Sequence, residues 1–219
     1  RKVTEVKNGA LVYEKDGKIV ECKAAKALCS IGRRPVTQGI GLENIGVALE
    51  RGAVITDRHM MTNVPNVYAA GDVNGKSMLA HTAYREAEVA VNHMTGKRDY
   101  MRYEAIPAVI YTYPEVACVG ETEETAKQKG IEYDCQKLPF IYSGRYVAEN
   151  EGGESLCKIL VEKNSRRILG VHLMGSYVSE MIYGAALMIE TEMRVDDAKE
   201  LVFPHPTVCE IIRETLFKF

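Results

Sequence analysis

The sequence predicts a strand-to-helix unit of α/β type over residues 62–94 and an α+β domain with an antiparallel sheet beyond residue 104. The first of three observations is a short apolar run, Val67 to Ala70, which ends in Gly71-Asp72 and precedes a helical pattern, as in open α/β sheets. The second is a shift to charged residues from Lys97 to Glu104, which predicts a domain boundary. The third is that runs of strands precede runs of helices in the remainder.

Residues 1–31 alternate as in a β-meander, with hairpin turns at Asn8-Gly9 and Asp16-Gly17. The last run, Lys26 to Ile31, is predicted as a strand that ends at Gly32-Arg33-Arg34-Pro35. A glycine that closes a strand lets a ligand approach the backbone, and two arginines can bind phosphate. A solvated turn is the alternative, and the motif alone favours it.

Residues 36–66 are rich in predicted loops. The run from Gly39 to Asn44 imitates the start of a dinucleotide-binding fingerprint, but it lacks a preceding strand, a third glycine and a long following helix. We therefore do not interpret it as a phosphate-binding loop.

The run Val67 to Ala70 is predicted as a buried strand whose carboxyl end carries Gly71 and Asp72. The glycine permits close approach, and the aspartate can accept hydrogen bonds from polyol or ribose hydroxyls. Alternatively, Asp72 caps the next element. After Met78-Leu79-Ala80-His81, apolar residues at helical spacing predict a helix from Ala83 to Met94 that packs on the strand.

The remaining patterns predict a sheet followed by helices, and Ser179 to Met193 carries an apolar stripe suited to a core or a subunit interface. Strand patterns cover residues 107–120, 132–138, 155–162 and 167–174, and helix patterns cover residues 122–129, 179–193 and 195–202.

His205 lies between Pro204 and Pro206, so its backbone has little freedom, and a helical pattern follows from Val208 to Phe219. Glu210 is close enough along the chain to hold one ring nitrogen of His205, which leaves the other nitrogen free to move protons. The alternative is a helix capping box, because Thr207 and Glu210 have the required spacing. Spacing alone favours the capping box.

The composition excludes several classes of protein. A net charge of −2 on 219 residues argues against nucleic acid as a main partner, and no apolar run is long enough to span a membrane. The six cysteines form no close pair and no zinc-spaced cluster, so we predict no metal site and interpret them as buried free thiols in a reducing compartment. Cys209 is a further candidate, because a thiol near a helix N-terminus can have a lowered pKa.

Three stretches, in register along the chain, resemble the flavoprotein pyridine nucleotide-disulfide oxidoreductases. Val67 to Asp72 with Met78 to His81 resembles the second FAD motif of that family. Ile110-Tyr111-Thr112-Tyr113-Pro114-Glu115-Val116-Ala117 resembles the start of its dimerisation domain, and His205-Pro206-Thr207-x-x-Glu210 resembles its C-terminal catalytic motif. Within the family, the dihydrolipoamide dehydrogenase group is the most similar, more so than glutathione reductase.

The resemblance implies a division into residues 1–35, the end of the NAD-binding domain, residues 36–100, the second part of the FAD-binding domain, and residues 101–219, the dimerisation domain. The fold class it implies is α/β remnants of two dinucleotide-binding domains followed by an α+β interface domain.

The resemblance also assigns roles to single residues. Gly32 matches a glycine of the NAD-binding domain, Asp72 would hydrogen-bond the FAD sugar-alcohol chain, and Met78, Leu79, Ala80 and His81 would line the flavin. His205 would take the proton of a dihydrolipoyl thiol, and Glu210 would orient His205. His205 would act on the redox disulfide of the other subunit of a homodimer formed through residues 101–219.

The chain departs from the family pattern because it has neither the Cys-x4-Cys redox pair nor the two glycine-rich fingerprints. It begins at Arg1 and resembles the C-terminal portion of the family, so we interpret it as a piece of a longer protein and expect it to be inactive alone and not to retain FAD. The residues before His205, Phe203 and Pro204, also differ from the Ala- and His-rich residues that precede the catalytic histidine in the dehydrogenase group.

The expected enzyme is an FAD-dependent dihydrolipoyl dehydrogenase with NAD as acceptor. Its expected partner is the lipoyl-bearing acyltransferase of a 2-oxoacid dehydrogenase complex. The expected compartment is the cytoplasm, or the mitochondrial matrix in a eukaryote. The alternatives are a glutathione-type or other disulfide reductase of the same family, and a non-catalytic dimerisation module.

Overall fold

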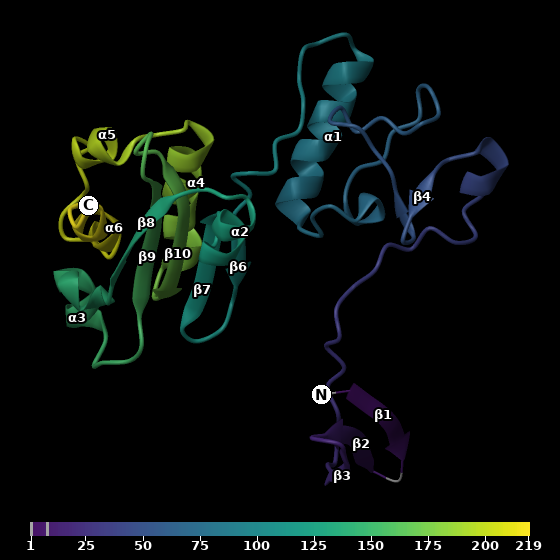
Figure 1. Ribbon diagram of the computed structural model, residues 1–219, viewed down its shortest axis with the longest axis horizontal. Coiled ribbons are helices and arrows are strands. Elements are labelled where there is room, and N and C mark those ends of the chain that lie inside the picture. The colour runs from purple at the N-terminus through teal and green to yellow at the C-terminus, as the bar shows by residue number, and fades with distance from the viewer. Residues whose placement is uncertain (1, 8) are drawn as a thin grey trace.

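The computed structural model of the protein describes residues 2–7 and 9–219, in which the strands form a three-stranded, a two-stranded and a five-stranded sheet (Figure 1). The architecture is mixed α/β with antiparallel sheets. Among these residues, no helix has both the length and the apolar character needed to cross a bilayer.

The N-terminal sheet contains β1 (Lys2–Lys7), β2 (Ala10–Lys15) and β3 (Lys18–Lys23) in antiparallel order, which confirms the predicted meander. Asp16 and Gly17 both have positive φ, as a tight hairpin turn requires. The other predicted turn involves Asn8, which lies outside the described residues.

The predicted strand from Lys26 to Ile31 is wrong. This segment is irregular, and the side chains of Leu28 and Ile31 are 94% and 93% exposed. An apolar run forms a strand only where a neighbour supplies ladder hydrogen bonds and covers its side chains. In the described part of the chain, no strand pairs with residues 26–31.

Residues 36–66 are mostly irregular, as predicted, and so are residues 67–79. Short elements interrupt them: η1 (Leu42–Ile45), β4 (Leu49–Glu50), β5 (Ala53–Val54) and η2 (Asp72–Asn74). No long helix follows Gly41 in this described stretch, in agreement with our rejection of a fingerprint there.

The prediction that Val67 to Ala70 forms a buried strand of a sheet is also wrong. The segment is half-buried and makes a single β-bridge, between Tyr68 and Met61. Backbone hydrogen bonds join Thr62 N to Val67 O at 2.8 Å and Ala69 N to Met60 O at 3.0 Å. A strand of an open sheet needs neighbours along its length, and the described residues provide one short partner.

Helix α1 (Ala80–Met94) begins three residues before the predicted start and ends at the predicted place, before Gly96. Its buried residues Val89 and Ala90 form a small core with Met60 and Met101. This core holds α1 against the irregular segments on either side of it.

The five-stranded sheet has the order β6-β7-β10-β9-β8, and all its neighbours are antiparallel. Its strands are β6 (Ala108–Ile110), β7 (Glu115–Gly120), β8 (Tyr133–Leu138), β9 (Leu156–Glu162) and β10 (Ile168–Gly175). The predicted strand over residues 107–120 is therefore two strands, because a turn at residues 111–114 divides it.

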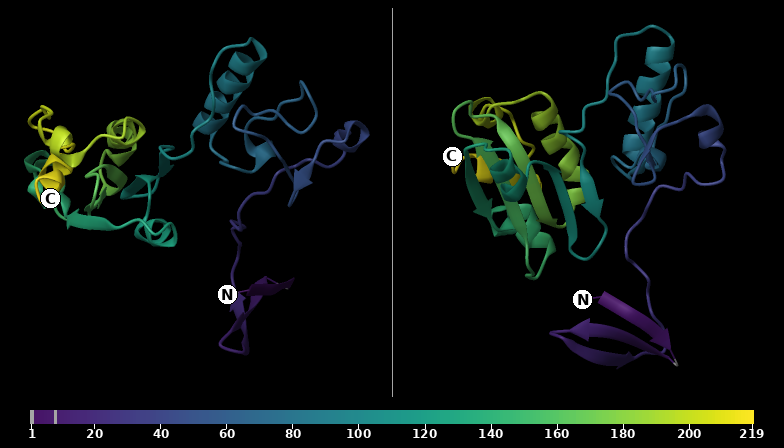
Figure 2. Two further views of the ribbon diagram at one scale, coloured as in Figure 1. Left: turned by 45° about the horizontal axis from the view of Figure 1, so that its top comes forward. Right: turned by 45° about the vertical axis from the view of Figure 1, so that its right-hand side comes forward.

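One face of this sheet carries the main core. Leu173 on the central strand stands opposite Ala117 on one side and Cys157 on the other, and all three are buried. Helix α4 (Val178–Glu190) packs beside β7 and β10, and α6 (Glu210–Leu216) packs beside β8 and β9 (Figure 2). The apolar stripe predicted for α4 is thus largely core.

Two further helices match the predictions closely, α2 (Glu123–Gln128), which Thr122 caps, and α5 (Val195–Lys199). The sequence analysis missed η3 (Phe140–Tyr142) and α3 (Gly144–Glu149). These short elements place Ser143, the cap of α3, beside the segment that carries His205.

Candidate functional site

His205 projects from the turn that leads into α6, and its side chain is 79% exposed. Ring atom Nδ1 lies 2.9 Å from Oε1 of Glu210, whose side chain is 20% exposed. The predicted contact is therefore present. It leaves Nε2 of an exposed imidazole free for proton transfer, as a general acid or base requires.

The second oxygen of Glu210 has a different partner. Oε2 accepts the backbone N–H of Thr207 at 2.9 Å, which is the glutamate half of a capping box. The threonine half is absent, since Thr207 Oγ1 donates to Pro204 O at 2.7 Å. The Thr207 N–H is the main cause of a pKa below the ordinary value for the Glu210 carboxyl, and the contact with His205 acts in the same direction.

The turn is anchored on both sides. Val208, Ile211 and Ile212 are buried in the main core. The buried Ser143 donates its hydroxyl to Thr207 O at 3.0 Å, and the same hydroxyl accepts from Tyr146 N. Sequence analysis missed this role of Ser143, although a serine before a short helix is a recognisable cap signal.

The suggestion of a lowered thiol pKa at Cys209 is wrong. Cys209 is half-buried, and burial raises the pKa of its thiol. The expectation that the cysteines are buried is wrong for Cys22 and Cys29, which are exposed. In the described part of the chain, no group of three or more His, Cys, Asp or Glu side chains is placed to hold a metal ion.

The second predicted cluster lies around η2 and the start of α1. Asp72 is exposed at the first position of η2, directly after the buried Gly71. A Cβ at Gly71 would lie 3.2 Å from Cβ of Ala83, so the glycine lets the backbone pass close to α1. No side chain caps the N-terminus of α1, which follows Leu79.

The four residues from Met78 to His81 do not share one cavity. Met78 lines a cavity beside β5, whereas His81 lines another of about 450 Å³ between α1 and α4. Leu79 and Ala80 form the start of α1. His81 Nε2 lies 2.8 Å from Pro107 O, a contact that joins α1 to the segment before β6.

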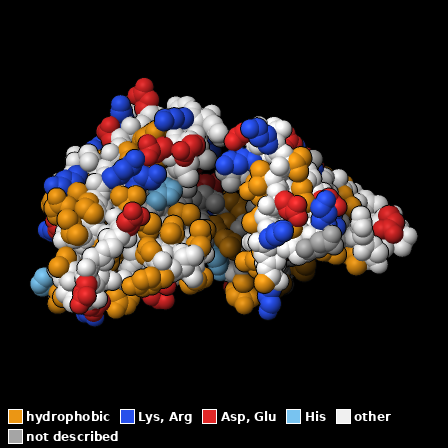
Figure 3. Space-filling model, turned by 90° about the horizontal axis from the view of Figure 1, so that it is seen from below, with side chains coloured by type: hydrophobic (Ala, Val, Ile, Leu, Met, Phe, Trp, Pro, Cys, Tyr) orange, Lys and Arg blue, Asp and Glu red, His pale blue; other side chains and the backbone are white. Residues whose placement is uncertain are grey.

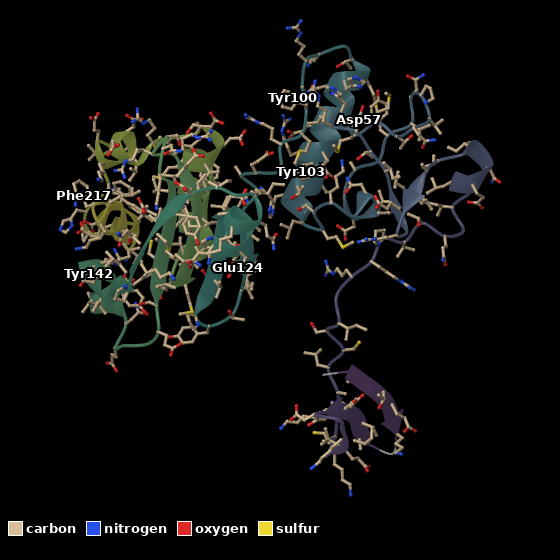
Figure 4. The ribbon with its side chains drawn as sticks, viewed as in Figure 1. Asp57, Tyr100, Tyr103, Glu124, Tyr142 and Phe217 are labelled. Atoms are coloured by element: carbon tan, nitrogen blue, oxygen red, sulfur yellow. The ribbon has the colours of Figure 1, made fainter. Side chains whose placement is uncertain are left out.

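Glu86 is the main residue of this region that the sequence analysis missed. It is fully buried on α1 and accepts hydrogen bonds from Gly71 N at 2.5 Å, Asn74 Nδ2 at 2.9 Å and Tyr103 Oη at 2.7 Å. Tyr103 lies beside α1 in Figure 4. The Glu86 carboxylate therefore fixes the backbone that presents Asp72.

Gly32 stands apart from the other predicted site residues. It has φ of +102°, in the exposed segment after the N-terminal sheet, and no atom lies within 4 Å of a Cβ built on it. The structure thus brings His205 and Glu210 together, whereas Asp72 lines neither the cavity of Met78 nor that of His81. The pair on the turn before α6 and the cluster beside α1 belong to different parts of the chain (Figure 1).

Comparison with known proteins identifies both parts. Residues 106–216 match the dimerisation domain of the pyridine nucleotide-disulphide oxidoreductases. Residues 1–87 match the pyridine nucleotide-disulphide oxidoreductase domain. The chain belongs to the pyridine nucleotide-disulphide oxidoreductase family. The predicted resemblance is confirmed.

Relatives in this family include dihydrolipoyl dehydrogenases that are named as mitochondrial. The protein of Caenorhabditis elegans is 40% identical over 201 residues, which cover 91% of this chain and 40% of that protein. The protein of Bos taurus is 42% identical over 188 residues, or 85% of this chain and 37% of that protein. The leghemoglobin reductase of Glycine max is 39% identical over 88% of this chain and 37% of its own length.

Solved structures agree with these relationships. LpdA from Mycobacterium tuberculosis has a TM-score of 0.85 and 26% identity, and the match covers 97% of this chain and 46% of that one. The flavoprotein disulfide reductase RclA from Escherichia coli has a TM-score of 0.83 at 22% identity, over 98% of this chain and 48% of that one, which shows a shared fold alone. The chain thus spans about 40% of the length of the curated relatives.

Proposed function

We propose that the chain is the C-terminal part of an oxidoreductase that reoxidises dihydrolipoyl groups through a redox disulfide and FAD, with NAD as the acceptor. In this proposal residues 1–35 end the NAD-binding domain, residues 36–100 form the second part of the FAD-binding domain, and residues 101–219 form the dimerisation domain. The observation that carries it is the exposed imidazole of His205, held through Nδ1 by Glu210.

The role of His205 is to accept the proton of a dihydrolipoyl thiol at Nε2, and the resulting thiolate then attacks the redox disulfide. Glu210 keeps the ring oriented and stabilises the positive charge that protonation creates. The main-chain N–H of Thr207 helps to keep Glu210 ionised while it does so. Bound FAD would accept the electron pair from the reduced disulfide and pass it to NAD.

Membership of the family implies use of FAD and a pyridine nucleotide. The residues around η2 suit the binding of FAD. Asp72 presents an exposed carboxylate, which suits the hydroxyls of a sugar-alcohol chain. The N-terminus of α1, which no side chain caps, favours a group with partial negative charge. We propose that Asp72 and Met78 to His81 hold the flavin part of FAD, and that Gly32 belongs to the NAD-binding side.

A homodimer through residues 101–219 belongs to the same proposal. In this proposal, which follows the resemblance to the family, the imidazole of His205 serves the disulfide of the other subunit. The proposed partner is the lipoyl-bearing acyltransferase of a 2-oxoacid dehydrogenase complex. The proposed compartment is the cytoplasm, or the mitochondrial matrix in a eukaryote, since curated relatives are named as mitochondrial.

The test compares His205→Gln with wild type in the full-length protein, with dihydrolipoamide and NAD as substrates. His59→Gln is the control, because His59 stacks on His93 and lies outside the proposed site. We expect His205→Gln to lose roughly 10²–10⁴-fold in kcat, the usual contribution of a general acid–base group, with unchanged FAD content and oligomeric state. Wild-type activity in His205→Gln would contradict the proposal and favour a non-catalytic dimerisation module.

A second substrate assay is needed, because a relative of similar identity is named leghemoglobin reductase. Assay of the full-length protein with glutathione disulfide or another disulfide in place of the lipoyl substrate distinguishes the reductase alternative. The 219-residue chain alone should show no turnover with dihydrolipoamide, NAD and FAD, since it has no Cys-x4-Cys pair.

A further inference from the structure

Three hydrogen bonds to Thr207 hold the turn that carries His205. The backbone N–H of Thr207 donates to Glu210 Oε2 at 2.9 Å, and its hydroxyl donates to Pro204 O at 2.7 Å. Both of these contacts lie within the turn. The third comes from a distant part of the chain, because the hydroxyl of Ser143, 64 positions away, donates to Thr207 O at 3.0 Å. The Ser143 hydroxyl therefore links the turn to α3 by a directional contact.

Ser143 is itself held in place by the packing of η3 and α3. Its side-chain oxygen accepts the N–H of Tyr146 at 3.3 Å, as the cap of a helix does. The ring of Tyr146 packs edge-on against Phe140, with 5.3 Å between the ring centroids, and both side chains belong to the main core. Beyond the last turn of α3, Asn150 Nδ2 donates to Tyr146 O at 2.8 Å. The hydroxyl of Ser143 thus projects from an element that is fixed at both ends.

The contact between Ser143 and Thr207 is shielded from water on the serine side. Ser143 is 1% exposed, and its hydroxyl donates one hydrogen bond and accepts another. Removal of the hydroxyl would take a partner from both Thr207 O and the Tyr146 N–H. Buried polar groups that lose a partner are costly, so the backbone of the turn is then expected to shift until Thr207 O finds another donor.

A shift of the turn would reach the imidazole of His205 through one peptide and one carboxylate. The Thr207 N–H fixes Glu210 Oε2, and Glu210 Oε1 lies 2.9 Å from Nδ1 of His205. The His205 side chain is 79% exposed, so its surroundings restrain the ring little. A displacement of about 1 Å at a reacting group can cost on the order of a hundredfold in rate. The aim of the ring therefore depends on where the turn is held.

We propose that Ser143 is a positioning residue for the dithiol step, and that its hydrogen bond to Thr207 O holds the turn so that Glu210 can orient His205. This inference rests on the proposed function, in which Nε2 of His205 accepts the proton of a dihydrolipoyl thiol. Ser143 is buried and does not reach the thiol, so its effect passes through the turn. The effect is confined to reduction of the enzyme by the dithiol, because hydride transfer from NADH to the flavin does not use His205.

The test measures the two half-reactions separately in the full-length protein, by anaerobic rapid mixing with dihydrolipoamide or with NADH and detection of the flavin absorbance. Ser143→Ala is compared with Thr122→Ala, because Thr122 caps a different helix, α2, by accepting Thr125 N at 3.1 Å. We expect Ser143→Ala to slow reduction by dihydrolipoamide roughly ten- to hundredfold and to change reduction by NADH by less than about twofold. Thr122→Ala should change neither rate.

Further variants distinguish positioning from a general loss of structure. Ser143→Thr keeps a hydroxyl that can cap α3 and donate to Thr207 O, so it should restore most of the rate with dihydrolipoamide. The double variant Ser143→Ala/His205→Gln should be no slower than His205→Gln, since Ser143 acts through His205. Thermal unfolding establishes that each variant is folded. If Ser143→Ala does not fold, Ser143→Cys replaces it, because a thiol has a similar shape but donates weakly.

The outcomes separate this inference from the proposed function. If His205→Gln is slow with dihydrolipoamide while Ser143→Ala reacts as wild type does, the role of Ser143 is overturned and the proposed function stands. Equal slowing of both half-reactions in Ser143→Ala, or further slowing in the double variant, would also overturn that role. If wild type is not reduced by dihydrolipoamide, or if His205→Gln is reduced as fast as wild type, the proposed function itself fails.

Discussion

At the residue scale, the two oxygens of Glu210 have separate partners. One contacts the imidazole of His205 and the other accepts the N–H of Thr207. The capping and catalytic interpretations of Glu210 are therefore compatible, because a single carboxylate shapes the turn and orients the ring. A substitution at this position affects both the local backbone and the proton-transfer group.

Glu210→Gln in the full-length protein should lower kcat on the order of a hundredfold, because the amide neither carries the negative charge nor stabilises a protonated His205. The pKa of the Glu210 carboxyl is lowered, so it stays ionised through neutral and mildly acidic pH. Steady-state kinetics of wild type and variant at neutral pH measures the loss. A kcat in Glu210→Gln equal to that of wild type would contradict this role.

Glu86 offers a matched comparison with Glu88 on the same helix. Glu86 is fully buried with three donors around it, whereas Glu88 is exposed and pairs with Arg85 at 3.5 Å. Glu86→Ala leaves buried donors unpaired and should lower the unfolding free energy by about 3 kcal/mol. Glu88→Ala should change it by less than about 1 kcal/mol. Chemical denaturation of both variants measures the difference, and equal losses would contradict the importance of the network.

Sequence distance explains which of these contacts could be predicted. Glu210 lies five positions from His205, so their spacing along the chain was enough to predict the contact between them. The partners of Glu86 come from residues 12 to 17 positions away, and Ser143 lies 64 positions from Thr207. A sequence pattern shows that Glu86 interrupts an apolar helix face, but only the fold supplies the donors that make its burial favourable.

At the scale of elements, two paired glycines of β7 and β10 stand where the neighbouring backbone leaves no room for a side chain. Gly120 and Gly170 are opposite one another in the ladder, and a Cβ at Gly170 would lie 2.0 Å from the carbonyl oxygen of Glu121. The contact is with backbone, which cannot rotate away as a side chain can. The pairing at this end of the sheet therefore requires the absence of a side chain.

Gly170→Ala should destabilise the protein by about 3 kcal/mol or more, since a Cβ would push β10 away from the turn after β7. Gly144→Ala is the control, because no atom lies within 4 Å of its built Cβ and its φ is negative. That change should be neutral or stabilising by up to about 1 kcal/mol. Chemical denaturation measures the unfolding free energy of both variants, provided that its dependence on denaturant concentration is unchanged. A Gly170→Ala variant as stable as wild type would show that the strands can move apart.

Asp99 adds a polar link between α1 and the segment after it. Its carboxylate accepts from Arg85 Nη1 at 2.9 Å and Nη2 at 2.5 Å, from Asn92 Nδ2 at 2.8 Å and from Tyr100 N at 2.9 Å. The hydrogen bonds from Arg85 are the largest cause of a pKa that falls from 3.8 to about 2. The folded state thus binds this proton less tightly than the unfolded chain does.

The stabilisation from Asp99 should therefore be complete above pH 4 or so and decrease as pH falls toward about 2. Asp99→Asn should be less stable than wild type at neutral pH, and the difference in unfolding free energy should shrink through that window. Urea denaturation at a series of pH values measures it. A difference that stays constant down to pH 2 or so would mean that the carboxylate charge contributes nothing.

The strands of the sheet over residues 108–175 could be predicted because they are short runs rich in apolar residues, and every residue of β9 and β10 is buried or half-buried. The runs at residues 26–31 and 67–70 contain similar residues but did not become sheet strands. The difference lies in the neighbours, since strand formation needs a partner backbone, and a local apolar run carries no information about one.

At the scale of the whole molecule, the described residues form two separate hydrophobic cores. The larger contains buried residues from Ala117 to Leu216, and the smaller contains Met60, Val89, Ala90 and Met101. The ion pair of Arg102 with Glu190 and the contact of His81 with Pro107 connect the two parts. Figure 3 shows hydrophobic side chains among charged ones over the surface of both lobes that this view presents. Exposed contacts of this kind stabilise little compared with either core.

A fragment of residues 105–219 should therefore fold without the rest of the chain. It retains the complete larger core and all five strands of the main sheet. We expect cooperative unfolding and slow amide exchange in β9 and β10, whose pairing lies at the centre of that core.

Sedimentation of the same fragment tests the proposed homodimer. Tyr183 on α4, with a side chain 74% exposed, is the position to substitute by glutamate, and Tyr142, which lies elsewhere and is also exposed, is the matched control.

If residues 105–219 are the dimerisation unit and α4 lies at its two-fold contact, Tyr183→Glu should yield a folded monomer while Tyr142→Glu remains a dimer. The reason is that a carboxylate at an apolar contact must be desolvated twice, once in each subunit. A fragment that stays monomeric at high concentration in the wild-type sequence would count against the dimer. A fragment that fails to fold would show that the small core around α1 is needed to complete the larger one.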